Sequence, residues 1–206
     1  MSELSSASAV RPRTVVLIGL GWLLIATSLS AAGVIRSLRP PAPQFVLGGL
    51  TAVLLAGGWF VARFRVWLSV IDARWLVALN LTRFVGVYFL YLYARGQLPY
   101  AFAVPGGLGD IVVASLATVL LLAGPPRGTW RRRAYAGWNA LGLADILFVV
   151  ATAARLGLGD PESMAALLRL PPSLLPTFLV PLIIVSHVVL GVRLASARVQ
   201  RCRVLR

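Results

Sequence analysis

Six apolar runs of about 18 to 23 residues constrain the fold of this sequence more than any other feature. A helix needs about 20 apolar residues to cross the ~30 Å hydrocarbon core of a bilayer, because each residue adds about 1.5 Å. The sequence therefore predicts an all-α integral membrane bundle of six transmembrane helices, in one polytopic domain. A signal peptide is the alternative for the first run, but its apolar region would span only about 7–15 residues. We expect the spans at residues 15–35, 45–62, 75–94, 106–124, 134–156 and 174–195.

Charged residues are few and unevenly placed. They make up 13% of the chain, against about 25% in an ordinary soluble domain. All 20 basic residues are arginine, which is typical of GC-rich coding and indicates a bacterial source. The arginines cluster between the apolar runs, a pattern that orients membrane helices and does not indicate nucleic-acid binding. The single cysteine, Cys202, excludes an intrachain disulfide and a multi-cysteine metal site, and we expect no metal and no cofactor.

The arginines also divide unequally between the two sides of the expected bundle. Fourteen lie in the N-terminus, the 63–74 linker, the 125–133 linker and the tail, whereas five lie on the opposite side. The positive-inside rule then places both termini in the cytoplasm, with the protein in the inner (plasma) membrane and its arginines near anionic lipid headgroups. Five tryptophans are expected to form an aromatic belt at the cytoplasmic boundary: Trp59, Trp67, Trp75, Trp130 and Trp138.

Three ionisable residues fall inside the apolar runs, where charge is costly. Counting about 1.5 Å per residue places Arg83 ~12 Å, Asp145 ~16 Å and His187 ~10 Å from the cytoplasmic ends of their helices. An unpaired Arg or Asp near a helix centre costs about 2.5–3.5 kcal/mol on insertion scales. We therefore expect Arg83 and Asp145 to form a pair, with His187 as a hydrogen-bond partner or proton acceptor.

Two asparagines extend this candidate polar site. Asn80 lies one turn before Arg83 on the same helix face, and the pattern Asn80-x-x-Arg83 can be overlaid on Asn139-x-x-Gly142 in the fifth run. Gly142 lies one turn before Asp145 and would allow close helix approach. Two interpretations remain open, namely a clamp that only holds helices together and a working site such as a proton relay.

The stretch from residue 96 to 109 carries no charge and is more apolar than an exposed loop should be. It contains Pro105, Gly107 and Gly109 and leads into Asp110. If Asp110 is the N-cap of the fourth span, that helix is only ~21 Å long, which is short of the ~30 Å core. Either the helix begins near Pro105, or the stretch enters the membrane as a re-entrant segment and marks an outer cavity.

The motif Gly107-Leu-Gly-Asp110, followed by Ile-Val-Val-Ala-Ser-Leu, is similar to the Gly-x-Gly-Asp motif of the aspartyl intramembrane proteases. The resemblance covers about ten residues and implies an enzyme with two membrane-embedded aspartates, here Asp110 and Asp145. In that family the other aspartate comes from an earlier helix, whereas Asp145 comes later. The depth count also places Asp110 near the outer face and Asp145 in mid-membrane, which does not favour a shared proton.

Two linkers are expected to lie at the membrane surface. Residues 63–74 mix basic residues with Trp67, which suits a segment at the headgroups. After the fifth span, Asp160, Pro161 and Glu162 form the sequence of an N-cap, a first helical proline and an acidic first turn. We expect a short surface helix to begin there, before the sixth span.

The sequence names no substrate. It has no nucleotide-binding loop, no Gly-x-Ser-x-Gly motif and no loop large enough for a catalytic domain, so an enzyme is the less favoured class. A small permease-like protein with a polar site in mid-membrane is the favoured function. The alternative is a non-catalytic accessory or assembly subunit of a membrane complex, acting as a homo-oligomer or with a membrane-protein partner.

Overall fold

The computed structural model describes the backbone of residues 12–204 and the side chains of residues 13–196. Every regular element within this range is a helix, and six of the described helices are long and apolar enough to cross a membrane. The predicted all-α class with six apolar helices is thereby confirmed. The side chains of Arg11, of Cys202 and of the tail arginines after residue 196 lie outside the described part, so the predictions that concern them stay predictions.

The chain folds into two compact units. The first runs to Ile71 and includes Ala154–Leu182, whereas the second is Asp72–Ala153 and continues from Ile183. Each unit is therefore assembled from an early and a late part of the chain.

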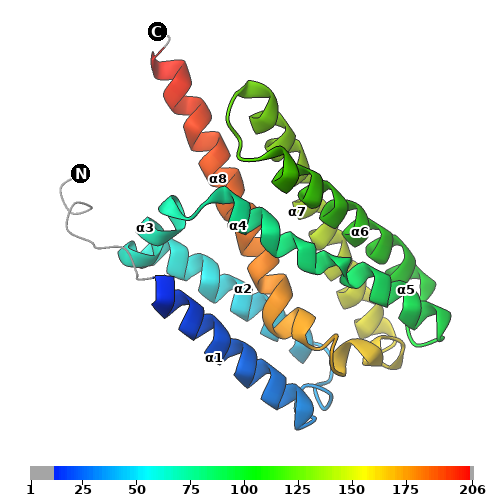
Figure 1. Ribbon diagram of the computed structural model, residues 1–206. Coiled ribbons are helices and arrows are strands. Elements are labelled where there is room, and N and C mark those ends of the chain that lie inside the picture. The colour runs from blue at the N-terminus through cyan, green and yellow to red at the C-terminus, as the bar shows by residue number, and fades with distance from the viewer. Residues whose placement is uncertain (1–11, 205–206) are drawn as a thin grey trace. The chain divides into compact units, whose positions relative to one another are not determined.

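In the first unit, α1 (Pro12–Ala31) and α2 (Ala42–Phe60) both pack against the π-helical turn η4 (Leu175–Leu179), as Figure 1 shows. Pro43 lies in the first turn of α2, where its fixed φ suits a helix start and its missing N–H costs nothing. The short helix α3 (Ala62–Val70) follows α2 and packs back on it, in the linker that was expected at the membrane surface.

The π-helical turn η4 has an identifiable cause in the sequence. Pro181 has no N–H with which to reach the carbonyl of Thr177, its α-helical partner four residues earlier. The indole Nε1 of Trp22 in α1 donates to that carbonyl at 3.0 Å instead. Trp22 also meets Phe178 edge to face, with ring centroids 4.8 Å apart. The indole thus supplies the donor that Pro181 lacks and holds α1 on η4.

In the second unit, the third apolar helix consists of three consecutive pieces: α4 (Ala73–Ala78), the 3₁₀ segment η2 (Leu79–Val85) and α5 (Gly86–Ala94). The carboxylate of Asp72 caps α4 by accepting from the Arg74 N–H at 2.9 Å. The helix α6 (Tyr100–Ala123) contacts all three pieces along its length (Figure 1).

The helices α7 (Thr129–Gly159) and α8 (Val180–Val204) contribute their residues up to Ala153 and from Ile183 to the second unit. Trp138 of α7 is buried and donates its indole N–H to the Val113 carbonyl of α6 at 3.0 Å. Its place in an aromatic belt was therefore predicted wrongly, because the indole points into the helix packing. Trp59, Trp75 and Trp130 are exposed, as a belt requires.

The expected short helix after the fifth span is present as the 3₁₀ segment η3 (Glu162–Leu168), but its start differs from the prediction. Pro161 takes the N-cap position with helical φ and ψ, and no side chain caps the segment. Asp160 instead follows the end of α7 directly, and its carbonyl accepts from the Ser163 hydroxyl at 2.7 Å. The predicted capping role of Asp160 is wrong because α7 continues to Gly159, three residues beyond the expected end of the fifth span, and the N-cap position of η3 falls on Pro161.

Candidate functional site

The site is organised by η2, and its 3₁₀ geometry has a local cause. The hydroxyl of Thr82 donates to the Leu79 carbonyl at 2.7 Å, and the Asn80 amide donates to the Leu76 carbonyl at 3.0 Å. Side chains that bond to nearby carbonyls compete with α-helical hydrogen bonds. A 3₁₀ helix has three residues per turn, so Asn80, Arg83 and Gly86 align along one face.

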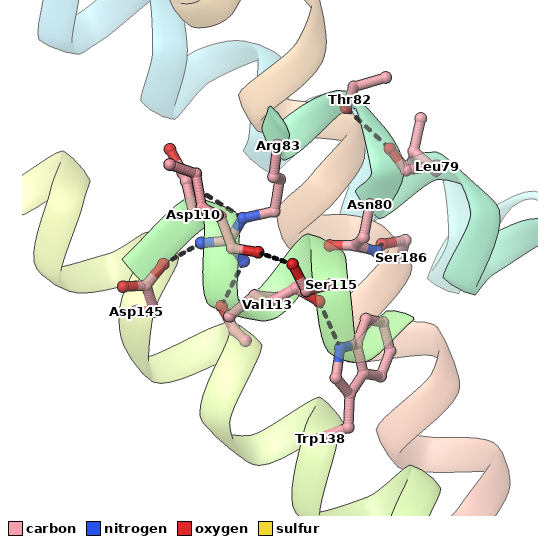
Figure 2. A network of polar contacts seen from close by, with 12 residues as sticks. Leu79, Asn80, Thr82, Arg83, Asp110, Val113, Ser115, Trp138, Asp145 and Ser186 are labelled. Carbon is pink, nitrogen blue, oxygen red and sulfur yellow. Dashed lines mark hydrogen bonds and ion pairs between the residues drawn. The ribbon is translucent and has the colours of Figure 1, made fainter. Parts of the chain in front are cut away.

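Arg83 is 1% exposed and binds two carboxylates and one carbonyl (Figure 2). Its Nε donates to Asp110 Oδ1 at 2.6 Å, its Nη1 to the Gly142 carbonyl at 2.9 Å, and its Nη2 to Asp145 Oδ2. The planar guanidinium presents its donors in a fixed fork, which suits simultaneous contacts to different helices. We call Arg83, Asp110 and Asp145 the Arg83 cluster; it joins η2 to both α6 and α7.

The position of Asp110 corrects the prediction from sequence. It is not an N-cap, because α6 begins at Tyr100 and includes Pro105, Gly107 and Gly109. Asp110 is 3% exposed and lies about 15 Å along the helix from its first residue. The 24 residues of α6 extend about 36 Å, so the shortfall in length that suggested a re-entrant segment disappears. Asp110 and Asp145 therefore meet at one guanidinium.

Glycines make room for the cluster. A Cβ at Gly109 would overlap the Asp145 carboxylate, so only glycine lets that carboxylate approach the backbone of α6. A Cβ at Gly86 would overlap the Gly107 carbonyl, and one at Gly107 would lie 2.8 Å from the Gly86 carbonyl. The α5 and α6 backbones thus touch directly one turn from Arg83.

His187 lies beside the cluster and is held by Asn139. The Asn139 Nδ2 donates to the backbone carbonyl of His187 at 3.1 Å, and Asn139 Oδ1 faces the imidazole Nδ1 at 3.0 Å. The ring packs on Trp138, with centroids 5.2 Å apart, and on Gly142, where a Cβ would lie 2.8 Å from Nε2. Gly142 therefore contacts the imidazole with its Cα side and Arg83 with its carbonyl.

The structure brings the expected partners Arg83 and Asp145 together and places Asn80, Asn139 and His187 around them. Asn80 is fully buried and donates to the Ser186 hydroxyl of α8 at 3.3 Å. His187 bonds to Asn139 and packs on Gly142, so it lies beside the Arg83–Asp145 pair and is not part of it. Pro105, Gly107 and Gly109 lie in the second and third turns of α6, so this helix begins five residues before Pro105.

The partnership of Asp110 with Arg83 was missed from the sequence. A signal was present, because a fourth span extended backward to about 24 residues places Asp110 at mid-length. Glycine and proline before Asp110 hid this, since in water they end helices. Within the described residues, no group of three or more His, Cys, Asp or Glu side chains is arranged to hold a metal ion.

An apolar six-helix protein with a buried arginine–carboxylate cluster is a broad class, and ionisable groups inside apolar helices are functional candidates within it. A family model described as "Domain of unknown function (DUF8737)" matches residues 40–195, and the chain belongs to this family. The matched region contains the whole Arg83 cluster together with Asn80, Asn139 and His187. No curated protein and no solved structure matches the chain.

Proposed function

We propose that the protein is a permease-like membrane protein that binds a proton or a small monovalent cation at the Arg83 cluster. The observation that carries the proposal is the charge of the cluster. One guanidinium faces two carboxylates, so the cluster has one negative charge in excess when both carboxylates are ionised. A buried charge is costly unless it is neutralised, and a bound cation would neutralise it.

The geometry supports this role. Arg83 bonds to only one oxygen of each carboxylate, Oδ1 of Asp110 and Oδ2 of Asp145, so the second oxygen of each is not bonded to the guanidinium. Asp145 Oδ1 lies against Gly109 of α6. The Asp145 side chain is 13% exposed and that of Asp110 is 4% exposed, so a cation would meet Asp145 first. We place the protein in the bacterial inner membrane with both termini in the cytoplasm and its basic linkers on anionic headgroups.

The experiment is a flux assay with the purified full-length chain in liposomes. A potassium gradient with valinomycin sets the membrane potential, an internal pH dye reports protons, and radiotracers report sodium and ammonium. We expect protein-dependent flux of at least one of these cations, and its loss in Asp145→Asn, which removes the excess charge but keeps a side chain that can bond to Arg83.

The matched control is Asp160→Asn, which makes the same chemical change at an exposed position after the end of α7. It should leave the flux unchanged. If the folded wild type and folded Asp145→Asn show equal flux, the excess negative charge of the cluster is not needed for cation transport, and the proposal is wrong.

A second candidate function, an accessory or assembly subunit, is favoured by the surface of α2. Gly48, Gly49, Ala52 and Ala56 form an exposed stripe of small residues, and a Cβ at either glycine would meet nothing within 4 Å. Small residues let membrane helices approach closely. If this stripe binds a partner helix or a second copy, Gly49→Leu should weaken cross-linked assemblies, and no cation flux should be found.

One feature of the structure supports the resemblance to aspartyl intramembrane proteases, and another opposes it. Asp110 and Asp145 do meet, contrary to the depth expected from sequence. The Arg83 guanidinium, however, occupies one oxygen of each, and a dyad that shares a proton needs its two carboxyl groups facing each other. The arrangement therefore favours an electrostatic site over a hydrolytic one.

A further inference from the structure

Two hydrogen-bond acceptors beside the Arg83 cluster have no partner among the described residues. They are Asn80 Oδ1 and His187 Nε2, and we call them the acceptor pair. Asn80 is 0% exposed and His187 is 1% exposed, so water at the surface does not satisfy either atom. Buried acceptors without partners are rare in folded proteins and need an explanation.

The hydrogen bonds of Asn139 show that His187 Nε2 is an acceptor. The backbone carbonyl of His187 can only accept, so it must face the Nδ2 of Asn139. The Oδ1 of Asn139 then faces the imidazole Nδ1, which must carry a hydrogen. In the neutral ring the lone pair is consequently on Nε2, the nitrogen that lies against Gly142.

Both acceptors belong to residues that share neighbours with the Arg83 cluster. Asn80 precedes Arg83 by one 3₁₀ turn and donates to Ser186, the residue before His187 on α8. The imidazole of His187 packs on Gly142, whose carbonyl accepts from Arg83. The excess negative charge and the two unpartnered acceptors are thus connected through shared neighbours.

We infer that the cation bound here is of the ammonium type, an N–H donor held by the excess charge of the Arg83 cluster and by hydrogen bonds to Asn80 Oδ1 and His187 Nε2. This inference rests on the proposed function and specifies its ligand. An ammonium group offers several N–H donors and a positive charge, and it accepts no hydrogen bond. It therefore supplies the positive charge and the hydrogen-bond donors that the site lacks.

Other cations fit the observations less well. A proton on His187 Nε2 would turn an unpartnered acceptor into an unpartnered donor and would leave Asn80 Oδ1 unchanged. Potassium has the charge and nearly the size of ammonium, but it donates no hydrogen bonds. A comparison of ammonium with potassium therefore isolates the hydrogen-bonding part of the inference.

The test uses the fact that the chain has one histidine. The full-length protein is labelled with ¹⁵N-histidine, purified with a histidine-free affinity tag and placed in lipid nanodiscs, so that the imidazole nitrogens give one set of signals. Ammonium chloride is then titrated against potassium chloride at constant pH and ionic strength. We expect ammonium to move the Nε2 signal toward that of a hydrogen-bonded nitrogen with saturation, and potassium to leave it in place.

Variants separate the contributions. Asp145→Asn removes the excess charge and should weaken the ammonium response at least tenfold, and Asn80→Ala should do the same by removing one acceptor. The control is Ser173→Ala in the first unit, which deletes a fully buried hydroxyl that likewise has no hydrogen-bond partner among the described residues. It should leave the response unchanged.

Failure of the inference differs from failure of the proposed function. If ammonium does not shift the Nε2 signal in a protein that still transports a cation, the ammonium inference is wrong and the proposed permease function remains supported. If ammonium and potassium shift the Nε2 signal equally, the site recognises only the charge of the cation, and the inference is also wrong. A saturable ammonium response in a protein without flux supports the binding site and refutes transport.

Discussion

Removing Arg83 should destabilise the protein far more than removing either of its aspartate partners. Arg83→Met leaves the buried carboxylate of Asp110 and the largely buried carboxylate of Asp145 without the guanidinium that pairs with both of them. Breaking one buried pair by removing one member costs about 3–5 kcal/mol, so the variant should lose at least that much. Since folded domains have only about 5–15 kcal/mol of stability, its folded yield should fall sharply.

Asp145→Asn should behave differently because it leaves one guanidinium and one carboxylate, which are balanced in charge. The amide oxygen can still accept from Arg83, and because the guanidinium stays ionised this hydrogen bond keeps a value within the range of about 1.5–3 kcal/mol for bonds to charged groups. The expected cost is about 1 kcal/mol. The double variant Arg83→Met/Asp145→Asn should stay unstable, because Asp110 remains without a partner, and adding Asp110→Asn should recover most of the loss.

The assay is reversible unfolding by SDS in mixed micelles, followed by circular dichroism, with the free energy of unfolding compared across the four variants and wild type. If charge balance determines the stability of the cluster, Asp145→Asn should be the most stable of the variants that change one residue, and Arg83→Met the least stable. If Asp145→Asn costs as much as Arg83→Met, or if the double variant is as stable as Asp145→Asn alone, the cluster does not act as a three-charge unit.

Three further predictions use the same structure. Trp22→Phe removes the donor to the Thr177 carbonyl and should lower the free energy of unfolding by about 1–3 kcal/mol. The loss should be smaller in a Pro181→Ala background, where a backbone N–H is restored, and equal losses in both backgrounds would show that the indole does not replace the missing donor. Gly86→Ala should cost about 1–3 kcal/mol by pushing α5 from α6, whereas Gly137→Ala, where a Cβ meets nothing within 4 Å, should be tolerated; equal losses in a thermal melt would refute the close crossing. With Cys202→Ser, Thr129→Cys should be labelled only from the cytoplasm and Glu162→Cys only from outside, as the proposed orientation requires. Labelling of Glu162→Cys from inside would overturn that orientation.

The six apolar helices and the all-α class followed from the sequence, because apolar runs of this length leave few alternatives to helices in lipid. The start of α6 did not, because Gly107, Gly109 and Pro105 were judged by their behaviour in water. Inside an apolar environment unpaired backbone groups cost more than glycine flexibility, so the helix continues to Tyr100. This one error displaced Asp110 from the cluster in which the structure places it.

The pairing of Arg83 with Asp145 could be predicted because both charges fall at similar depths and neither has another partner along its own helix. The 3₁₀ form of η2 and the π turn at η4 could not. In η2, the side chains of Thr82 and Asn80 bond to nearby carbonyls that α-helical N–H groups would otherwise use. At η4, Pro181 has no N–H for the Thr177 carbonyl, and the Trp22 indole takes its place. Such hydrogen bonds depend on tertiary contacts, and the periodicity of apolar residues in the sequence does not predict them.

The 3₁₀ pitch of η2 links the length of the third apolar helix to the direction in which its charge points. A 3₁₀ segment rises about 2.0 Å and turns about 120° per residue, against about 1.5 Å and 100° in an α-helix. If the seven residues of η2 adopted α-helical pitch, the helix would shorten by about 3.5 Å. Over the three residues from Asn80, Arg83 would turn by about 60° relative to that asparagine. A substitution that relaxes the pitch, such as Thr82→Ala, would therefore change the hydrophobic length of the helix and the aim of its guanidinium together.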